Sequence, residues 1–269
     1  MSRYLSLESF QITRPQKIKW RAYLDDKDIL ETLKSKSLKA FLSQTDQVLT
    51  AHQISYRYYP LTKEQYLEWL KYYTENMIRH GYDAIATAEW YDDRRALGRE
   101  LLGMFLEQQT GKGMKLVASG IFTQQDRELG TFAFKASERI KISKDNKGTL
   151  GAVLDYLFLR EMLNNNVKNI SAGRSRNAFG FYNTLGYLSY NLRFGFVPSA
   201  AEDTSFEITV PLNEDGTSLF YGVKNNIFSL FSVKKAGNSE RSTEFAQLSA
   251  PEVPYQEIEY SPEQVISGL

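Results

Sequence analysis

The sequence predicts an α/β (α+β) protein with a mixed, mainly antiparallel twisted sheet and helices on both faces. Three predicted strands, 115–122, 131–134 and 139–143, follow one another directly, which is the pattern of an antiparallel meander. Apolar residues at helical spacing then predict a helix over 151–164, and a short strand near 169–172 follows it. Because parallel strands need a crossover connection, this helix adds a parallel pair to the sheet.

The chain before the meander begins with an arm, a helical region and a strand. Residues 1–24 are basic and aromatic and predict an arm or edge strand. A helical pattern covers 26–43, with a break near Ser35. Over 54–59 the apolar and polar side chains alternate with a period of two, which predicts a half-buried strand.

Two longer helices are predicted next. Thr62 with Gln65 three residues later forms a capping-box pattern, which begins a helix that ends at His80. Gly81 stands where a left-handed C-terminal cap is needed. A second helix is predicted over 93–109. Its inward-facing residues are Leu97, Leu101, Met104 and Phe105.

The last third of the chain mixes helix, strand and a polar tail. Residues 177–194 predict a mostly helical segment, and 206–210 alternates as a late strand. Two apolar runs, 219–223 and 227–233, predict a hairpin. From Lys234 onward the chain is rich in Ser, Glu and Pro, which predicts an extended or disordered tail.

These elements predict three parts. Residues 1–50 form an N-terminal extension of arm plus helix, 51–233 the main domain, and 234–269 the tail. The longest apolar runs, such as 101–106, are too short to span a bilayer, so we expect no membrane span and a cytoplasmic protein.

Composition limits the chemistry. Among 269 residues, 33 are Lys or Arg and 32 are Asp or Glu, so the net charge of +1 argues against a protein that coats DNA. Without cysteine there is no thiolate nucleophile and no cysteine metal site. With His52 and His80 as the two histidines, a three-histidine metal centre is excluded, and we expect no metal.

The informative stretch is 144–196. It contains Gly148–Ala152 at the start of a predicted helix, the tripeptide Gly173-Arg174-Ser175, and Asn177–Tyr187 with the letters NAFGFYNTLGY. Tyr190–Pro198 follows as YNLRFGFVP. Together with the element order, these motifs resemble the GCN5-related N-acetyltransferase (GNAT) superfamily. The tripeptide and the segment after it resemble the FemAB-like branch. The resemblance covers about residues 50–233.

The resemblance implies acetyl-CoA or another acyl-CoA as co-substrate. Its pyrophosphate would bind at Lys147, Gly148, Thr149 and Gly151, and Asn177 joins this set. The residues support this independently, because glycines let a ligand approach the backbone and a helix N-terminus offers unpaired N–H groups.

The resemblance also implies a proton donor for the leaving thiolate. Tyr182 occupies the place of the family's tyrosine, and Tyr190 is the competitor because Tyr190–Phe196 is a second, offset match. Glu138, next to the third strand of the meander, is the candidate base for the attacking amine.

The acceptor is expected to be a small-molecule or peptide amine. Arg174 and Arg176 flank Ser175, and these three residues would bind a carboxylate or phosphate of the acceptor. A homodimer is left open.

Three functions therefore compete. The first is an acyl-CoA-dependent N-acyltransferase in which the amine attacks the thioester directly. In the cofactor loop pattern (Q/R)-x-x-G-x-(G/A), however, Asp145 and Leu150 stand at the first and last positions, and Asn191 replaces the FemAB-like lysine. The alternatives are a FemAB-like aminoacyltransferase that uses aminoacyl-tRNA, and a non-catalytic binding or assembly module of the same fold.

Overall fold

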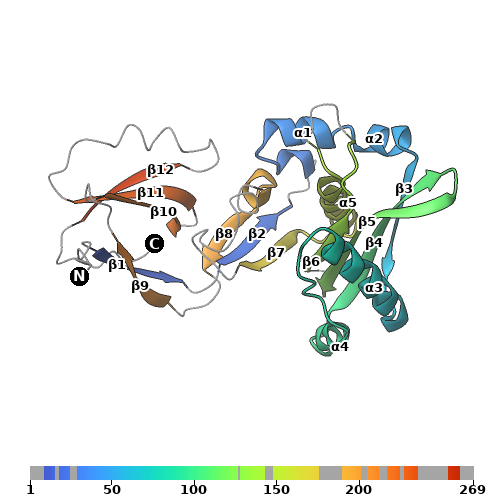
Figure 1. Ribbon diagram of the computed structural model, residues 1–269, viewed down its shortest axis with the longest axis horizontal. Coiled ribbons are helices and arrows are strands. Elements are labelled where there is room, and N and C mark those ends of the chain that lie inside the picture. Colours follow the sequence, from blue (N-terminus) through green and yellow to red (C-terminus); the bar gives the residue numbers. More distant parts are fainter. Residues whose placement is uncertain are drawn as a thin grey trace, which may run out of the picture. The chain divides into compact units, whose positions relative to one another are not determined.

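A computed structural model describes most of the chain (Figure 1). The described residues are 9–15, 18–24, 29–126, 128–142, 148–175, 190–200, 205–211, 217–224, 227–235 and 254–260. The chain divides into two compact units. One is Ala22–Gly173, and the other combines Met1–Arg21 with Arg174–Leu269.

The unit Ala22–Gly173 is built on a sheet in which five strands follow the order β3-β4-β5-β6-β7 (Figure 1). Their bounds are Ile54–Pro60, Glu100–Thr110, Gly113–Gln125, Leu129–Ser137 and Asn169–Ser175. β3 to β6 pair antiparallel, whereas β6 and β7 pair parallel. The predicted mixed, mainly antiparallel sheet is confirmed.

Helices cover both faces of this sheet. α3 (Lys63–Arg79) and α4 (Glu89–Ala96) pack on one face, where Trp69 of α3 shares a core with Ile121 of β5. α5 (Leu150–Asn164) packs on the other face, where Phe158 stacks on Phe122 with ring centroids 3.9 Å apart. Successive side chains of a strand point to opposite faces, so Ile121 and Phe122 separate the two layers.

Three short helices of this unit pack near α5 and β3. They are η1 (Ile29–Glu31), α1 (Lys36–Leu42) and α2 (Thr45–Ala51). η1 and α1 contact α5, and α2 contacts β3. The predicted break near Ser35 is confirmed, because its side chain accepts a hydrogen bond from the Leu38 N–H as the N-cap of α1.

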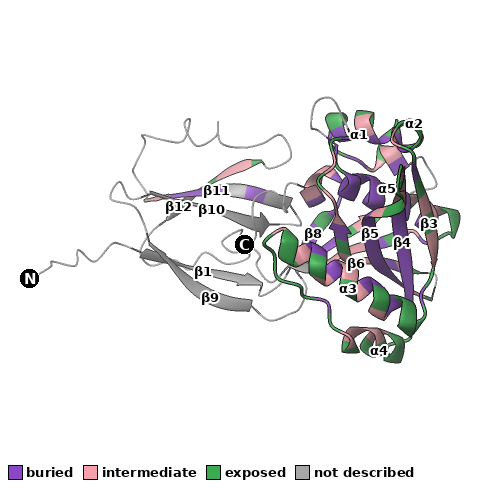
Figure 2. Ribbon diagram, turned by 45° about the vertical axis from the view of Figure 1, so that its right-hand side comes forward, coloured by how far each residue is buried: buried purple, intermediate pink, exposed green. Residues whose placement is uncertain are grey.

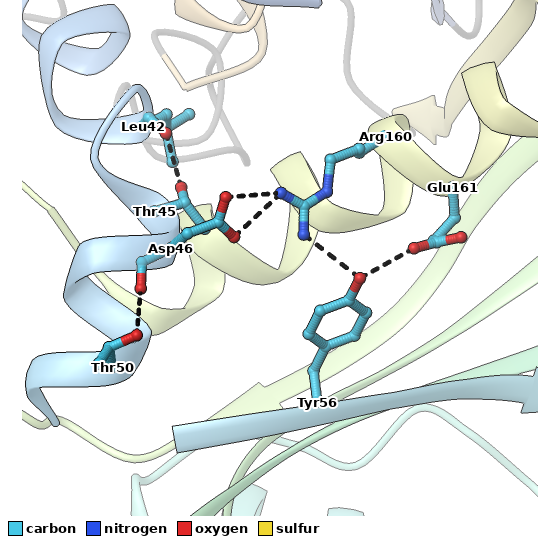
Figure 3. Close-up of polar contacts among 7 residues, drawn as sticks. All are labelled: Leu42, Thr45, Asp46, Thr50, Tyr56, Arg160 and Glu161. Atoms are coloured by element: carbon cyan, nitrogen blue, oxygen red, sulfur yellow. Dashed lines mark hydrogen bonds and ion pairs between the residues drawn. The ribbon is translucent and has the colours of Figure 1, made fainter. Parts of the chain in front are cut away.

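A polar network ties three of these elements together (Figure 3). The Arg160 guanidinium of α5 donates to the Asp46 carboxylate of α2 at 3.1 Å and to the Tyr56 hydroxyl of β3 at 3.2 Å. The Tyr56 hydroxyl in turn donates to Glu161 of α5 at 3.0 Å. Because Arg160 is shared, α2 and β3 are held at one position along α5.

The predicted ends of two helices are confirmed. Thr62 and Gln65 form both hydrogen bonds of a capping box at the start of α3. Gly81 follows the C-cap of α3 with a φ of +76°, which a residue with a Cβ adopts only with strain. α5 ends at the predicted asparagine-rich stop, where Asn166 has a φ of +59°.

The predicted helix over 93–109 is wrong. α4 is earlier, at Glu89–Ala96, and Glu100–Thr110 is the strand β4. β4 has helices on both faces, so its residues 101–106 are all buried and appear as one continuous apolar run (Figure 2). A continuous apolar run is compatible with the period of a helix and with that of a strand, so periodicity alone does not distinguish the two. Leu97, expected to face inward, is 57% exposed.

The predicted strand over 139–143 is also wrong in its described part. The meander consists of β4, β5 and β6, and Arg139–Ile142 forms no strand. The Glu138 N–H still donates to the Val117 carbonyl at 2.8 Å, but the chain then leaves the ladder.

The other unit contains further pairs of strands. β1 (Ser9–Pro15) pairs with β9 (Ser205–Pro211), and β2 (Ile18–Tyr23) pairs with β8 (Val197–Ala200), both antiparallel. The predicted hairpin is confirmed as β10 (Thr217–Lys224) and β11 (Ile227–Lys235).

The tail contributes a strand to the second unit. β12 (Tyr255–Tyr260) pairs parallel with β11. The Gln256 side chain donates to Ser229 at 2.8 Å, and Lys234 forms an ion pair with Glu257. In the described part of the chain, no helix has the length and apolar character to cross a membrane.

The packing of α3 on the sheet gives a stability prediction. The Trp69 indole N–H donates to the Ser119 hydroxyl at 2.9 Å, and both residues are buried. Ser119→Ala leaves the indole N–H without a partner, so we expect the free energy of unfolding in urea to fall by about 1–3 kcal/mol. Ser55→Ala, on the exposed side of β3, is the control and should change it by less than about 0.5 kcal/mol. Equal effects would contradict the role of this hydrogen bond.

Candidate active site

The parallel strands β6 and β7 separate soon after they meet. Their ladder joins Leu129–Thr131 to Asn169–Ser171, and no further pair joins these strands in their described residues. Gly173 has a φ of +84°, and its N–H donates to the Ser171 hydroxyl at 3.1 Å. The glycine of the Gly173-Arg174-Ser175 motif therefore interrupts the extended backbone of β7 just past the last residue that pairs with β6.

The first turn of α5 lies beside the end of β6. A Cβ added at Gly151 would lie 3.7 Å from the Ser137 hydroxyl. Thr149 is the N-cap, and its hydroxyl accepts a hydrogen bond from the Ala152 N–H at 3.2 Å. The N–H groups of Leu150 and Gly151 have no acceptor within a helix that begins here. The helix start thus brings backbone donors close to the place where β6 has left β7.

The two glycines of the predicted cofactor loop differ in their surroundings. A Cβ at Gly148 would lie 2.2 Å from the ring of Phe41, so the missing side chain makes room for α1. At Gly151 the nearest protein atoms would be at ordinary contact distances of 3.7 and 3.8 Å. A Cβ would therefore fit at Gly151, which is itself buried, whereas Phe41 occupies that side of Gly148.

An ion pair between an exposed lysine and a buried aspartate lies one turn further along α5. Lys135 of β6 and Asp155 of α5 are 2.5 Å apart, and the Asp155 side chain is 4% exposed. Lys135 and Ser137 lie on the same face of β6, as do Gly151 and Asp155 on α5. The pair thus fixes the helix start against the strand end. Sequence reasoning missed it, although an aspartate inside the apolar run 150–159 was a visible signal.

Glu138 opens on the opposite face of the sheet. Its carboxylate forms an ion pair with Arg79 of α3 at 3.0 Å, and the Glu138 side chain is 15% exposed. Burial raises the pKa of nearby Tyr72 to about 12, and the negative charge of Glu138 adds to the rise. The Tyr72 hydroxyl and the Asn76 side-chain nitrogen are buried, and neither has a hydrogen-bond partner among the described residues.

The remaining predicted site residues are not brought together in the described structure. Tyr190 lies in the other unit, in a helical turn where its ring is 4.7 Å from that of Phe194. Arg174 and Ser175 belong to β7, but their side chains lie outside the described residues. Four predicted residues lie outside the described residues entirely, namely Lys147, Arg176, Asn177 and Tyr182.

Metal-ligating residues are not clustered in the described ranges. There, no group of three or more His, Asp or Glu side chains could hold a metal ion. The two histidines end helices instead. His80 caps α3, with its ring nitrogen Nδ1 2.9 Å from the Asn76 carbonyl, and His52 caps α2.

The comparisons with known proteins identify the fold. No known family profile matches the chain, and no curated protein is significantly similar to it. Among solved structures, FemX is similar with a TM-score of 0.50 and 8% identity, over 71% of this chain and 61% of FemX. The chain thus spans less than two thirds of FemX.

Two further structures are similar at TM-scores of 0.43. The tandem GNAT protein from the clavulanic acid biosynthesis pathway shares 13% identity, over 76% of this chain and 55% of that one. The C-terminal domain of a putative lysylphosphatidylglycerol synthetase from Agrobacterium fabrum shares 12%, over 70% and 60%. The likeness to FemX and the sheet topology define a GNAT-like fold, as the sequence resemblance implied.

The two loop glycines form a matched pair for a stability test. Gly148→Ala places a methyl group on the Phe41 ring, so we expect the free energy of unfolding to fall by about 1–3 kcal/mol. Gly151→Ala meets ordinary contacts and favours the helix, so stability should stay unchanged or rise by up to about 1 kcal/mol. Urea denaturation measures both, and a larger loss in the Gly151 variant would contradict the packing at this helix start.

Proposed function

We propose that the chain is a transferase that moves an acyl group from acyl-CoA to an amine. One observation carries the proposal: α5 begins beside the end of β6, just past the point where β6 and β7 separate. Strands that separate leave room for an extended ligand between their backbones, and a helix start attracts negative charge.

The donor would bind along this region. Its pyrophosphate would accept hydrogen bonds from the N–H groups of Leu150 and Gly151, because Thr149 already satisfies that of Ala152. The resemblance adds Lys147 and Asn177 to the donor site. The proposal needs no metal, since the amine attacks an already activated carbonyl carbon.

The chemistry requires two proton transfers. The amine nitrogen forms a bond to the thioester carbon and loses a proton, while the carbon–sulfur bond breaks and the thiolate gains one. Glu138 would take the amine proton, directly or through water. Its ion pair with Arg79, at 3.0 Å, fixes the position of the carboxylate just after β6. Tyr182, or Tyr190 in its place, would protonate the thiolate.

The acceptor would be a small-molecule or peptide amine that also carries an anionic group. Arg174 and Ser175 follow Gly173 directly within β7, so the positive φ of that glycine sets the direction of their backbone. Guanidinium groups bind carboxylates and phosphates through two parallel hydrogen bonds. The proposal assigns Arg174, Ser175 and Arg176 to the acceptor.

A second candidate is a FemAB-like aminoacyltransferase whose donor is an aminoacyl ester of tRNA. Two observations favour it: Phe41 fills the open side of Gly148, and the glycine of Gly173-Arg174-Ser175 has the positive φ that shapes β7. The likeness to FemX agrees with this alternative. The third candidate is a non-catalytic binding or assembly module with a GNAT-like fold.

Acetyl-CoA binding separates these candidates. Ligand at about 100 times its Kd should stabilise the folded protein by about 2.7 kcal/mol, seen as a rise in Tm. We expect Gly151→Val to lose this rise, because the branched side chain occupies the space above the helix start. Gly111→Val, in a turn where a Cβ has open space, should keep it. If acetyl-CoA leaves the wild-type Tm unchanged and the protein binds aminoacyl-tRNA, the donor is aminoacyl-tRNA and the second candidate holds.

Replacing the tyrosine hydroxyl tests the proton donor. Tyr182→Phe should lower kcat by about 10²–10⁴-fold with little change in KM, because only the hydroxyl is removed. The wild-type rate should fall at high pH as the phenol ionises, and the variant should lack this fall. Tyr190→Phe is the matched control. Loss of activity in that variant alone would assign the role to Tyr190, and activity in both would refute a tyrosine donor.

A further inference from the structure

The sheet extends beyond the last turn of α5. Phe122 lies under Phe158 and is opposite Leu102 in the ladder of β4 and β5. One step further along the same face, Glu100 is opposite Gln124. On β3, Tyr58 is opposite Met104 and so also points to the α5 side. The strand ends therefore carry side chains past the place where the helix stops.

A cavity occupies this corner of the unit. It has a volume of about 470 Å³, within the range of roughly 300–1,000 Å³ that is usual for small-molecule sites. Tyr58, Glu100, Leu102 and Gln124 line it from the sheet, and Asn164–Asn166 line it from the end of α5. The cavity thus combines one carboxylate with amides, a phenol and an apolar floor.

The charges around the cavity exclude an anionic ligand. Among the described residues, the lining contains the charged Glu100 and no Lys or Arg. Arg160 is nearby on α5, but Asp46 and Tyr56 bind its guanidinium (Figure 3). Burial, with the negative charges of Glu161 and Glu100, raises the pKa of Tyr58, so its hydroxyl stays protonated at neutral pH.

The polar groups of the lining can both donate and accept hydrogen bonds. The Tyr58 hydroxyl and the side chains of Gln124 and Asn164 have no hydrogen-bond partner among the described residues. Asn165 donates to the Glu161 carbonyl at 2.8 Å, which leaves its own side-chain oxygen for other donors. Such groups match a ligand whose own groups both donate and accept, as hydroxyls do.

We propose that this cavity binds a neutral polyhydroxylated ligand, a mono- or disaccharide. Vicinal hydroxyls suit the side-chain amides of Gln124 and Asn164, and the C–H face of a sugar ring suits Leu102. A cationic ligand is disfavoured, because Glu100 is the one carboxylate among the described lining residues. The site lies at the opposite end of α5 from the proposed donor site. A helix of 15 residues is about 22 Å long, so the two sites are separate and this proposal does not rest on the acyltransferase.

Saturation-transfer NMR on the full chain tests the proposal. The probes are glucose, N-acetylglucosamine and cellobiose, with putrescine as the cation. We expect transfer to at least one saccharide and none to putrescine. Tyr58→Phe and Gln124→Ala should each weaken the saccharide's affinity by about 3–10-fold, the effect of one lost hydrogen bond.

The control is Gln109→Ala, an exposed glutamine at the opposite end of β4, which should leave binding unchanged. Tyr58→Phe keeps the ring, so its Tm should match the wild type. The proposal is overturned if no saccharide receives transfer, if putrescine binds in preference, or if the two cavity variants bind saccharide as the wild type does. Acetyl-CoA binding should be the same in all of these variants.

Discussion

The burial of α5 against the sheet is the contact on which the rest of the unit Ala22–Gly173 depends. Phe158 stacks on Phe122, and every residue from Leu150 to Leu159 is buried. A helix that is apolar on all sides cannot turn a face to water, so α1 and η1 must cover what the sheet leaves open. The Lys135–Asp155 ion pair fixes the helix along its axis, because displacement would leave a buried carboxylate unpaired.

Both candidate sites are consequences of where this helix begins and ends. Its first turn lies at the end of β6, past the last residues that pair with β7, and we propose an acyl-group donor there. Its last turn stops short of the strand ends, and the uncovered corner becomes a cavity. The position of α5 therefore sets the place of two candidate sites with different chemistry. One is a helix start with backbone N–H groups, and the other is a corner that combines amides with the carboxylate of Glu100.

The proposed donor site and the candidate base lie on opposite faces of β6. Ser137 lies next to Gly151 on the α5 side, whereas Glu138 pairs with Arg79 on the α3 side. Alternation along a strand thus puts the helix start and the candidate base on opposite faces of one short segment. A substrate that reached both would have to pass around or between strand ends, which agrees with a β6 that is no longer paired to β7 there.

The sequence by itself determined the elements whose signals are local. The capping box of Thr62, the left-handed Gly81, the alternation in β3 and the asparagine stop of α5 all depend on neighbouring residues, and all are present. The motif resemblance likewise led to the GNAT-like fold. Only the tertiary structure decided the rest. β4 is a strand because helices cover both of its faces, Gly148 is a glycine that makes room for Phe41, and Glu138 meets Arg79 from a distant helix. Each of these depends on residues far apart in the chain, and no local period or spacing records such contacts.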